Sequence, residues 1–157
     1  MSTANQNASV HVETIHPASF VHFRQTGPYG SAENRDLMED FKRWAKDAGH
    51  LDAASAVIAI VQDDPTKVAP ELCRYDIGVL RAHHAEVEAP AMESTFAGGR
   101  YAVFELNHTE DAVHQFWQDV AVRLGSAGLV PRAAPMIERY ALDMVNAHRC
   151  EILLPIE

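Results

Sequence analysis

Residues 100–124, RYAVFELNHTEDAVHQFWQDVAVRL, join a strand pattern directly to a helix pattern. The first seven residues are rich in aromatic and β-branched side chains, which favour an extended strand. Apolar residues then recur three and four positions apart, and these are Val113, Phe116, Trp117, Val120 and Leu124. Residues at that spacing share one face of a helix, so the segment predicts a strand followed by an amphipathic helix.

The start of this helix and the strands after it are also marked. Asn107 and Glu110 are spaced like a capping box, Thr109 is an alternative cap, and two glycines follow the last apolar position. Residues 135–140 and 150–156 are short, largely apolar runs of strand length. The second half of the chain therefore has the order strand, helix, strand, strand.

The first half of the chain begins in the same way. Residues 20–25 are dense in β-favouring side chains, and an additional strand pattern precedes them at residues 10–15. Ser31 is placed to cap the start of a helix and Gly49 to end it. The apolar stripe of this helix consists of Leu37, Phe41, Trp44, Ala45 and Ala48. We interpret that stripe as core.

Two more strand patterns complete the first half. Residues 56–61 are a continuous apolar run, typical of a strand buried on both faces, and residues 73–80 follow after a turn. Two strand-helix-strand-strand modules, over about residues 10–82 and 92–157, indicate an internal duplication behind a disordered tail at residues 1–9. We predict a single α+β domain. A pseudo-two-fold axis would relate the modules, with a mainly antiparallel sheet and both helices on one face.

Composition excludes several classes of function. The chain has 157 residues, of which 47% are hydrophobic, and this suffices for one compact domain. Its 13 basic and 22 acidic residues give a net charge of −9 without a basic cluster, so direct nucleic-acid binding is not expected. No apolar run approaches the roughly eighteen residues of a membrane helix, and the first residues do not resemble a signal peptide. We expect a cytoplasmic protein that does not contact membranes.

Three patterns resemble metal or redox sites, and we interpret each as structural. Asp63 and Asp64 stand in a turn without further ligands at a useful spacing. Residues 83–88 contain two histidines and two glutamates, but no third or fourth ligand recurs at fixed spacing. Cys73 and Cys150 are far apart in apolar contexts, which indicates reduced buried thiols. We predict no metal and no cofactor.

Glu138 stands out because it lies within a short apolar strand pattern. Alternation along the strand would place Glu138 on one face with Met136 and Tyr140, and Ile137 on the other with Arg139. A carboxylate held among apolar and aromatic groups suits a hydrophobic cation, since removing the charge from water is costly without compensation. The alternative is that Ile137 faces the core and Glu138 simply points into solvent.

A cleft between the duplicated modules is the expected place for such chemistry, because hollows between related units commonly bind small ligands. We expect the strand residues opposite the helices to line this cleft. That assignment puts Glu138 away from the helices and Ile137 toward them. It leaves Arg139 on the helix-facing side, where a charge is awkward.

Four stretches of the chain resemble a known family. They are DDP at residues 63–65, PELCRYD at residues 70–76, FAGGRYA at residues 96–102, and IERY at residues 137–140 followed by EILLPI at residues 151–156. Their order and spacing resemble the GyrI-like (gyrase-inhibitor-like) small-molecule-binding domain. This domain also serves as the effector-binding domain of some AraC-type and MerR-type multidrug regulators. The resemblance covers the chain from about residue 10 to its end.

The resemblance implies a cleft that takes bulky compounds, often cationic and aromatic. An acidic residue at the position matching Glu138 would neutralise the cation, and aromatic side chains would stack around it. A cation over an aromatic ring gains about 0.5–2 kcal/mol. The candidate ligand-binding residues are Glu138, Tyr140, Met136, Tyr101, Trp117, Tyr29 and Phe96.

Three functions remain open at this point. The first is a standalone module that binds hydrophobic, cationic or aromatic small molecules, since no helix-turn-helix precedes the first strand. The second is a hydrolase of reactive hydrophobic compounds, in which Glu138 with Tyr140 or Tyr101 would be catalytic. The third is a protein inhibitor of DNA gyrase. The partners compatible with these functions are the small molecule itself, a second copy of the chain, DNA gyrase or a separate regulator.

Overall fold

The computed structural model describes residues 10–50, 56–82, 86–141 and 149–157. The expected disordered tail, residues 1–9, lies outside the described residues. Within them, two α-helices and eight strands are present, together with one 3-10 turn at Pro70–Leu72. The helices are α1 (Ala32–Asp47) and α2 (Glu110–Ser126). The strands are β1 (His11–Ile15), β2 (Ala18–Thr26), β3 (Ala56–Val61), β4 (Arg74–Arg81), β5 (Met92–Phe96), β6 (Gly99–Asn107), β7 (Ile137–Ala141) and β8 (Arg149–Ile156).

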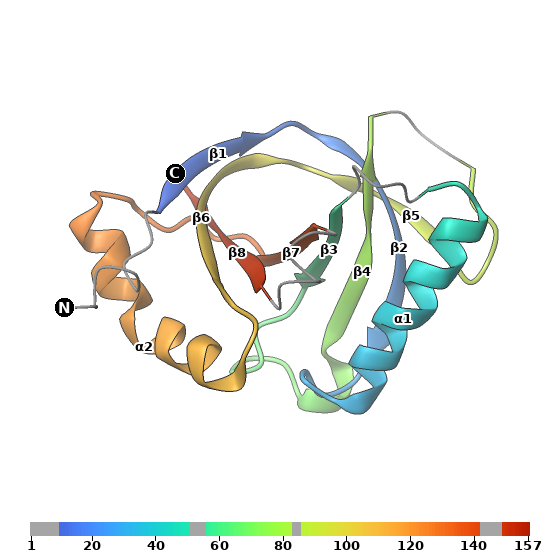
Figure 1. Cartoon of the computed structure of the whole chain (residues 1–157), viewed down its shortest axis with the longest axis horizontal. Coiled ribbons are helices and arrows are strands. Elements are labelled where there is room, and N and C mark those ends of the chain that lie inside the picture. The colour runs from blue at the N-terminus through green and yellow to red at the C-terminus, as the bar shows by residue number, and fades with distance from the viewer. Residues whose placement is uncertain (1–9, 51–55, 83–85, 142–148) are drawn as a thin grey trace.

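The eight strands form one antiparallel sheet in the order β1-β6-β8-β7-β3-β4-β2-β5. The sheet curls into an arch, and α1 and α2 lie beside its two halves (Figure 1). Helix α1 packs against β2 and β4, whereas α2 packs against β6. Each module therefore covers its own half of the sheet with its own helix. This confirms the predicted α+β class and the duplication.

The strand order is symmetric about the central pair β7–β3. In that pair Ala59 lies directly opposite Glu138. One residue earlier in each strand, Ile58 pairs with β4 and Ile137 pairs with β8, so the two strands make equivalent pairings outward from the centre. The pseudo-two-fold axis therefore passes between Ala59 and Glu138.

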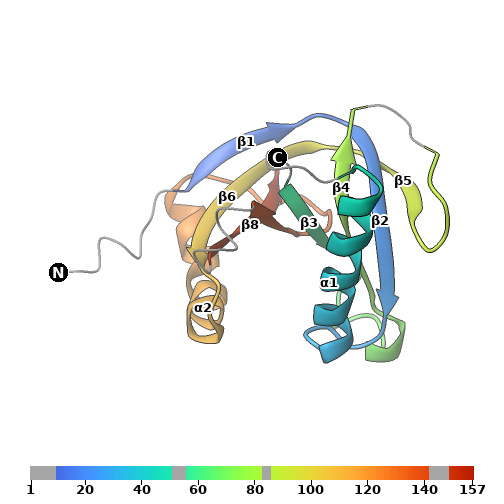
Figure 2. The ribbon, with the colours of Figure 1, turned by 45° about the vertical axis from the view of Figure 1, so that its right-hand side comes forward.

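The two outer strands are exchanged between the halves. Strand β1 precedes β2 in the chain but pairs with β6, while β5 precedes β6 but pairs with β2. Figure 2 shows β1 passing beside β6 before the chain continues into β2. Where the two connections cross, a side chain on Gly98 would collide with the carbonyl oxygen of Ile15, and the φ of Gly98 is +77°. Glycine is favoured there because it has no Cβ and adopts positive φ without strain.

The sequence predicted most of these elements. Ser31 caps α1 by accepting a hydrogen bond from the backbone N–H of Asn34 (3.3 Å), as expected. Thr109, the alternative cap, does the same for α2 through Ala112 (3.2 Å). The pattern did not predict β5, because this edge strand is mostly exposed and carries few apolar residues. Neither described helix is long and apolar enough to cross a membrane.

The two faces of the sheet are buried in different ways. On the helix side, Tyr140 belongs to the core under α1, and Met136 packs against the core under α2. Ile137 belongs to a third cluster on the opposite face, which among the described residues draws on neither helix. Glu138 therefore faces the helix side, and the expectation that it faces away from the helices is wrong. Strand alternation gave the correct grouping, but it cannot say which group meets the helices.

Candidate ligand-binding site

Glu138 lies in the central strand β7, at the pseudo-two-fold axis and between the parts of the core that the two helices cover. The residue is only partly accessible to solvent, whereas its strand neighbours Ile137 and Tyr140 are buried. Its strand, β7, lies inside the sheet because β3 flanks it on one side and β8 on the other. The alternative interpretation, a side chain that simply points into bulk solvent, does not describe it.

One side chain among the described residues contacts the carboxylate directly. The Tyr140 hydroxyl donates a hydrogen bond of 2.9 Å to Glu138 Oε2, two residues along the same face of β7. The Tyr140 ring also lies beside the ring of His108, with 5.3 Å between their centroids. A phenol and an imidazole thus flank the acid.

Burial sets the electrostatics of this group. It raises the pKa of the Glu138 carboxyl, while the hydrogen bond from Tyr140 and the nearby His108 lower it by less. Burial, followed by the field of Glu138, also raises the pKa values of the Tyr75 and Tyr140 hydroxyls. The same two causes raise the pKa of the Cys150 thiol to about 12. Burial thus disfavours the charged form of all four groups, as expected for a set that shares little water.

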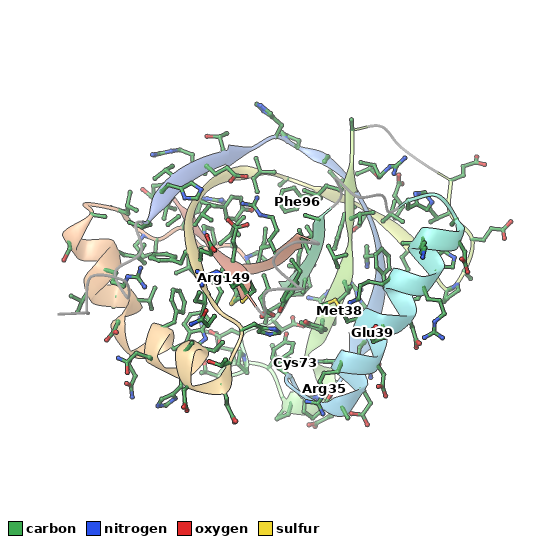
Figure 3. The ribbon with its side chains drawn as sticks, in the orientation of Figure 1. Arg35, Met38, Glu39, Cys73, Phe96 and Arg149 are labelled. Carbon is green, nitrogen blue, oxygen red and sulfur yellow. The ribbon has the colours of Figure 1, made fainter. Side chains whose placement is uncertain are left out.

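No lysine or arginine of the described residues forms an ion pair with Glu138. Arg139 points to the opposite face, where it donates hydrogen bonds to Glu13 (2.7 and 2.9 Å) and Glu151 (2.8 Å). Arg149 on the adjoining strand is held by Glu105 at 2.6 Å (Figure 3). Both arginines are therefore committed elsewhere. This arrangement also removes the difficulty of placing Arg139 toward a helix.

The GyrI-like family, described as a small molecule binding domain, matches residues 8–157 of the chain. The chain belongs to this family. The GyrI-like domain is also 40% identical, over 146 residues, to the "SPbeta prophage-derived putative transcriptional regulator YosT" of Bacillus subtilis (strain 168). That alignment covers 93% of this chain and 97% of the relative.

Solved structures share the fold at low sequence identity. SAV2435 bound to tetraphenylphosphonium has a TM-score of 0.60 and 18% identity, and the match covers 95% of this chain and 94% of SAV2435. EcmrR in its complex with DNA has a TM-score of 0.71 and 11% identity, and the match covers 95% of this chain and 57% of EcmrR. At these identities the likeness shows the fold alone.

The structure brings together some of the predicted site residues of the GyrI-like domain. Glu138 and Tyr140 share one face of β7, and Met136, which directly precedes this strand, lies on the same side of the sheet, as expected. Tyr29 lies next to Tyr75, with 6.3 Å between the centroids of the two rings, and so is one ring further from Glu138. Its hydroxyl donates to backbone carbonyls. Trp117 lies on α2, is 44% exposed and packs edge-on against Phe116.

The other two candidates lie on the far side of the sheet. Tyr101 and Phe96 stack on each other at 6.3 Å in the cluster of Ile137. In Figure 3, Phe96 lies under the arch of the sheet and apart from Met38 of α1. The Glu138 site is therefore built without Tyr101 and Phe96, and of the proposed catalytic tyrosines only Tyr140 contacts Glu138.

Sequence reasoning missed three neighbours of the acid, namely Tyr75, His108 and Cys150. Tyr75 occurs in the PELCRYD stretch. Alternation along β4 places it on the same face as the buried residues Ile77 and Val79. The signal that could have identified it is the symmetric order of the sheet, which brings β4 next to β3 and so close to β7. Cys73 and Cys150 are both free and buried, as predicted. Among the described residues, no group of three potential metal ligands is present.

Proposed function

We propose that this GyrI-like domain binds a hydrophobic cation at Glu138, on the helix side of the sheet and at the pseudo-two-fold axis. The observation that carries the proposal is a partly accessible carboxylate, removed from most water, whose one hydrogen-bond partner among the described residues is the Tyr140 hydroxyl. Such a group is costly to ionise unless an opposite charge approaches it. A ligand cation provides that charge.

The neighbours of Glu138 favour a soft, bulky cation over a small hydrated one. Tyr140, Tyr75 and His108 offer aromatic rings, and Cys150 and Met136 offer polarisable sulfur. A cation gains about 0.5–2 kcal/mol from each well-placed ring, and a weakly hydrated one loses little on leaving water. The tetraphenylphosphonium bound to SAV2435 is a cation of this kind, so it is a suitable probe for this domain.

The test is titration of the domain with tetraphenylphosphonium by calorimetry, at pH 7 and in parallel with the neutral analogue triphenylphosphine oxide. We expect Glu138→Gln to weaken binding of the cation at least about tenfold, which is about 1.4 kcal/mol. Binding of the neutral compound should change little. Because Gln has the shape of Glu and can still accept the Tyr140 hydrogen bond, the variant isolates the charge.

Glu71→Gln is the matched control, because Glu71 is exposed on the 3-10 turn and its replacement changes the net charge by the same amount. We expect this control to bind the cation as the unmodified chain does. Equal affinities of the Glu138→Gln and Glu71→Gln variants would show that the acid does not recognise the charge. Tyr140→Phe would then show whether the ring alone contributes.

A further inference from the structure

The sheet has two open ends, and the outer edge of β1 is the more accessible of them. Strand β1 pairs with β6 alone, just as β5 pairs with β2 alone. Among the described residues, no segment lies outside β1 in Figure 1 or Figure 2, whereas residues 86–91 pass outside β5 in both views. An edge strand presents unpaired N–H and C=O groups, and these can take up a further strand.

Alternate residues of β1 direct their backbone groups outwards. In β8, the carbonyl oxygen of Pro155 accepts a hydrogen bond from the N–H of Arg132 (3.0 Å), on the side away from β6. Residues along a strand bond to its two sides in turn, and the registers of β8 with β6 and of β6 with β1 are continuous. Carried across these registers, the alternation leaves the odd-numbered residues of β1 bonded to β6. The N–H and C=O groups of Val12 and Thr14 therefore point outwards, where no described residue provides a partner.

A second copy of β1 fits this edge in one antiparallel register. With Val12 opposite Val12 of the other copy, Thr14 lies opposite Val10, which directly precedes β1. The outward backbone groups of these three residues then find partners in both copies. The Val12 side chain lies on the helix side of the sheet, beside Ala102, and is 42% exposed. This register buries it against its counterpart, which is favourable for an apolar side chain.

The side chains on the opposite face of β1 select the same register. Each His11 would stand opposite Glu13 of the other copy, and an imidazole can donate a hydrogen bond to a carboxylate. Glu13 is already held by Arg139 through hydrogen bonds of 2.7 and 2.9 Å, which fix the carboxylate before the copies meet. A register centred on Glu13 would instead place the two acids directly opposite each other, which is destabilising.

We propose that this GyrI-like domain forms a symmetric dimer through β1, in which two eight-stranded sheets become one antiparallel sheet with a two-fold axis at Val12. A contact that uses the same strand of both copies closes on itself, whereas β1 against β5 of another copy would propagate into open chains. Glu138 lies in the central strand β7, far along the sheet order from β1. Self-association is therefore independent of cation binding, and Glu138→Gln should leave it unchanged.

Sedimentation velocity of the full chain, from about 10 to 300 μM, tests the dimer, because small interfaces of this kind bind weakly. Val12→Pro is the variant that probes the axis. The Val12 N–H points outwards, so proline costs no bond to β6. It removes the two hydrogen bonds that this N–H makes across the axis, one from each copy, and places a ring in the interface. We expect the dissociation constant of the dimer to rise at least about tenfold.

Thr95→Pro is the matched control, because Thr95 occupies an equivalent outward position on the other edge strand. The N–H of Gly27 donates to the carbonyl of Cys73 (2.8 Å) in the register of β2 with β4, so the even-numbered residues of β2 bond to β5 and Thr95 points outwards. This variant should associate as the unmodified chain does. A chain that stays monomeric over the whole range, or a dimer that Val12→Pro leaves unchanged or Thr95→Pro weakens instead, would overturn the proposal.

Cross-linking tests the register without a proline. In Val12→Cys the two thiols face each other across the axis, with about 5.5 Å between their Cα atoms, a distance that a disulfide spans. In Thr14→Cys, at a position that is also exposed, they lie about 13 Å apart along the strands. The natural Cys73 and Cys150 are buried and do not compete. Under mild oxidation we expect Val12→Cys to form the covalent dimer at least about tenfold faster than Thr14→Cys. Equal rates would overturn the register.

Discussion

Asp76 and Glu138 are two acids with little access to water, and they lie on opposite faces of the same sheet. Asp76 accepts hydrogen bonds from Nε and Nη2 of Arg24 and a third from Gln62 at 3.0 Å. Glu138 accepts one from the Tyr140 hydroxyl. A buried carboxylate that neighbouring side chains neutralise is costly to remove, whereas one with a single hydrogen-bond donor is costly to ionise without a ligand. The difference distinguishes a structural acid from the acid to which we assign a ligand-binding role.

Removal of the neutralised acid should have the largest effect. We expect Asp76→Asn to lower the free energy of unfolding by about 3 kcal/mol, because it leaves Arg24 without its carboxylate and a buried amide in its place. Urea unfolding followed by circular dichroism measures the change. Asp36→Asn, an exposed substitution on α1, is the control and should stay within about 0.5 kcal/mol. A loss of that small size at Asp76 would erase the distinction between the two acids.

The ion pairs of Arg139 provide an intermediate case. Its partners Glu13 and Glu151 have side chains that are 35% and 11% exposed, so solvent screens the first pair more than the second. We expect Arg139→Gln to cost roughly 2 kcal/mol, less than the Asp76 substitution, since part of the network is wet. The same unfolding experiment, repeated at high salt, should show the cost reduced for Arg139 and nearly constant for Asp76.

Glu138→Gln should have the smallest effect on stability and the opposite sign. The folded protein raises the pKa of this carboxyl above the ordinary 4.5, so ionisation in the folded state opposes folding. Below pH 4.5 the group is neutral in both states and costs nothing. As the pH rises through the folded pKa, the unmodified chain loses stability relative to the variant, by less than about 1 kcal/mol at pH 7.

Unfolding of both proteins from pH 4 to pH 8 would measure this difference. A variant less stable than the unmodified chain at pH 7, with the gap widening as the pH rises, would mean that unseen partners compensate the Glu138 carboxylate. In that case Glu138 would belong with Asp76.

Local patterns predicted the helices, their caps and most strands because those features depend on neighbours in sequence. Ser31 and Thr109 cap their helices, and Glu138 lies on one face with Tyr140, as alternation requires. Strand β5 was missed because an exposed edge strand needs no apolar pattern, only a partner. The face that the helices cover was assigned wrongly, since alternation is symmetric and only tertiary packing distinguishes the two sides.

The composition of the Glu138 site needed long-range information. Tyr75, His108 and Cys150 come from three separate segments, and the sheet order places their strands or loops around β7. Tyr101 and Phe96 were grouped with Glu138 because they are aromatic, yet β6 and β5 turn them to the other side.

The exchange of β1 and β5 makes the two repeats inseparable. A fragment that ended at residue 82 would carry β1 without β6 to pair with, and it would bare the edge of β2 that β5 covers. A fragment of the second repeat would have the mirrored defect. An ancestral single repeat would have met both needs only as a pair of identical chains that traded their first strands. The present chain has the topology of such a dimer in one polypeptide, and it places an acid on one side of its axis and an alanine on the other.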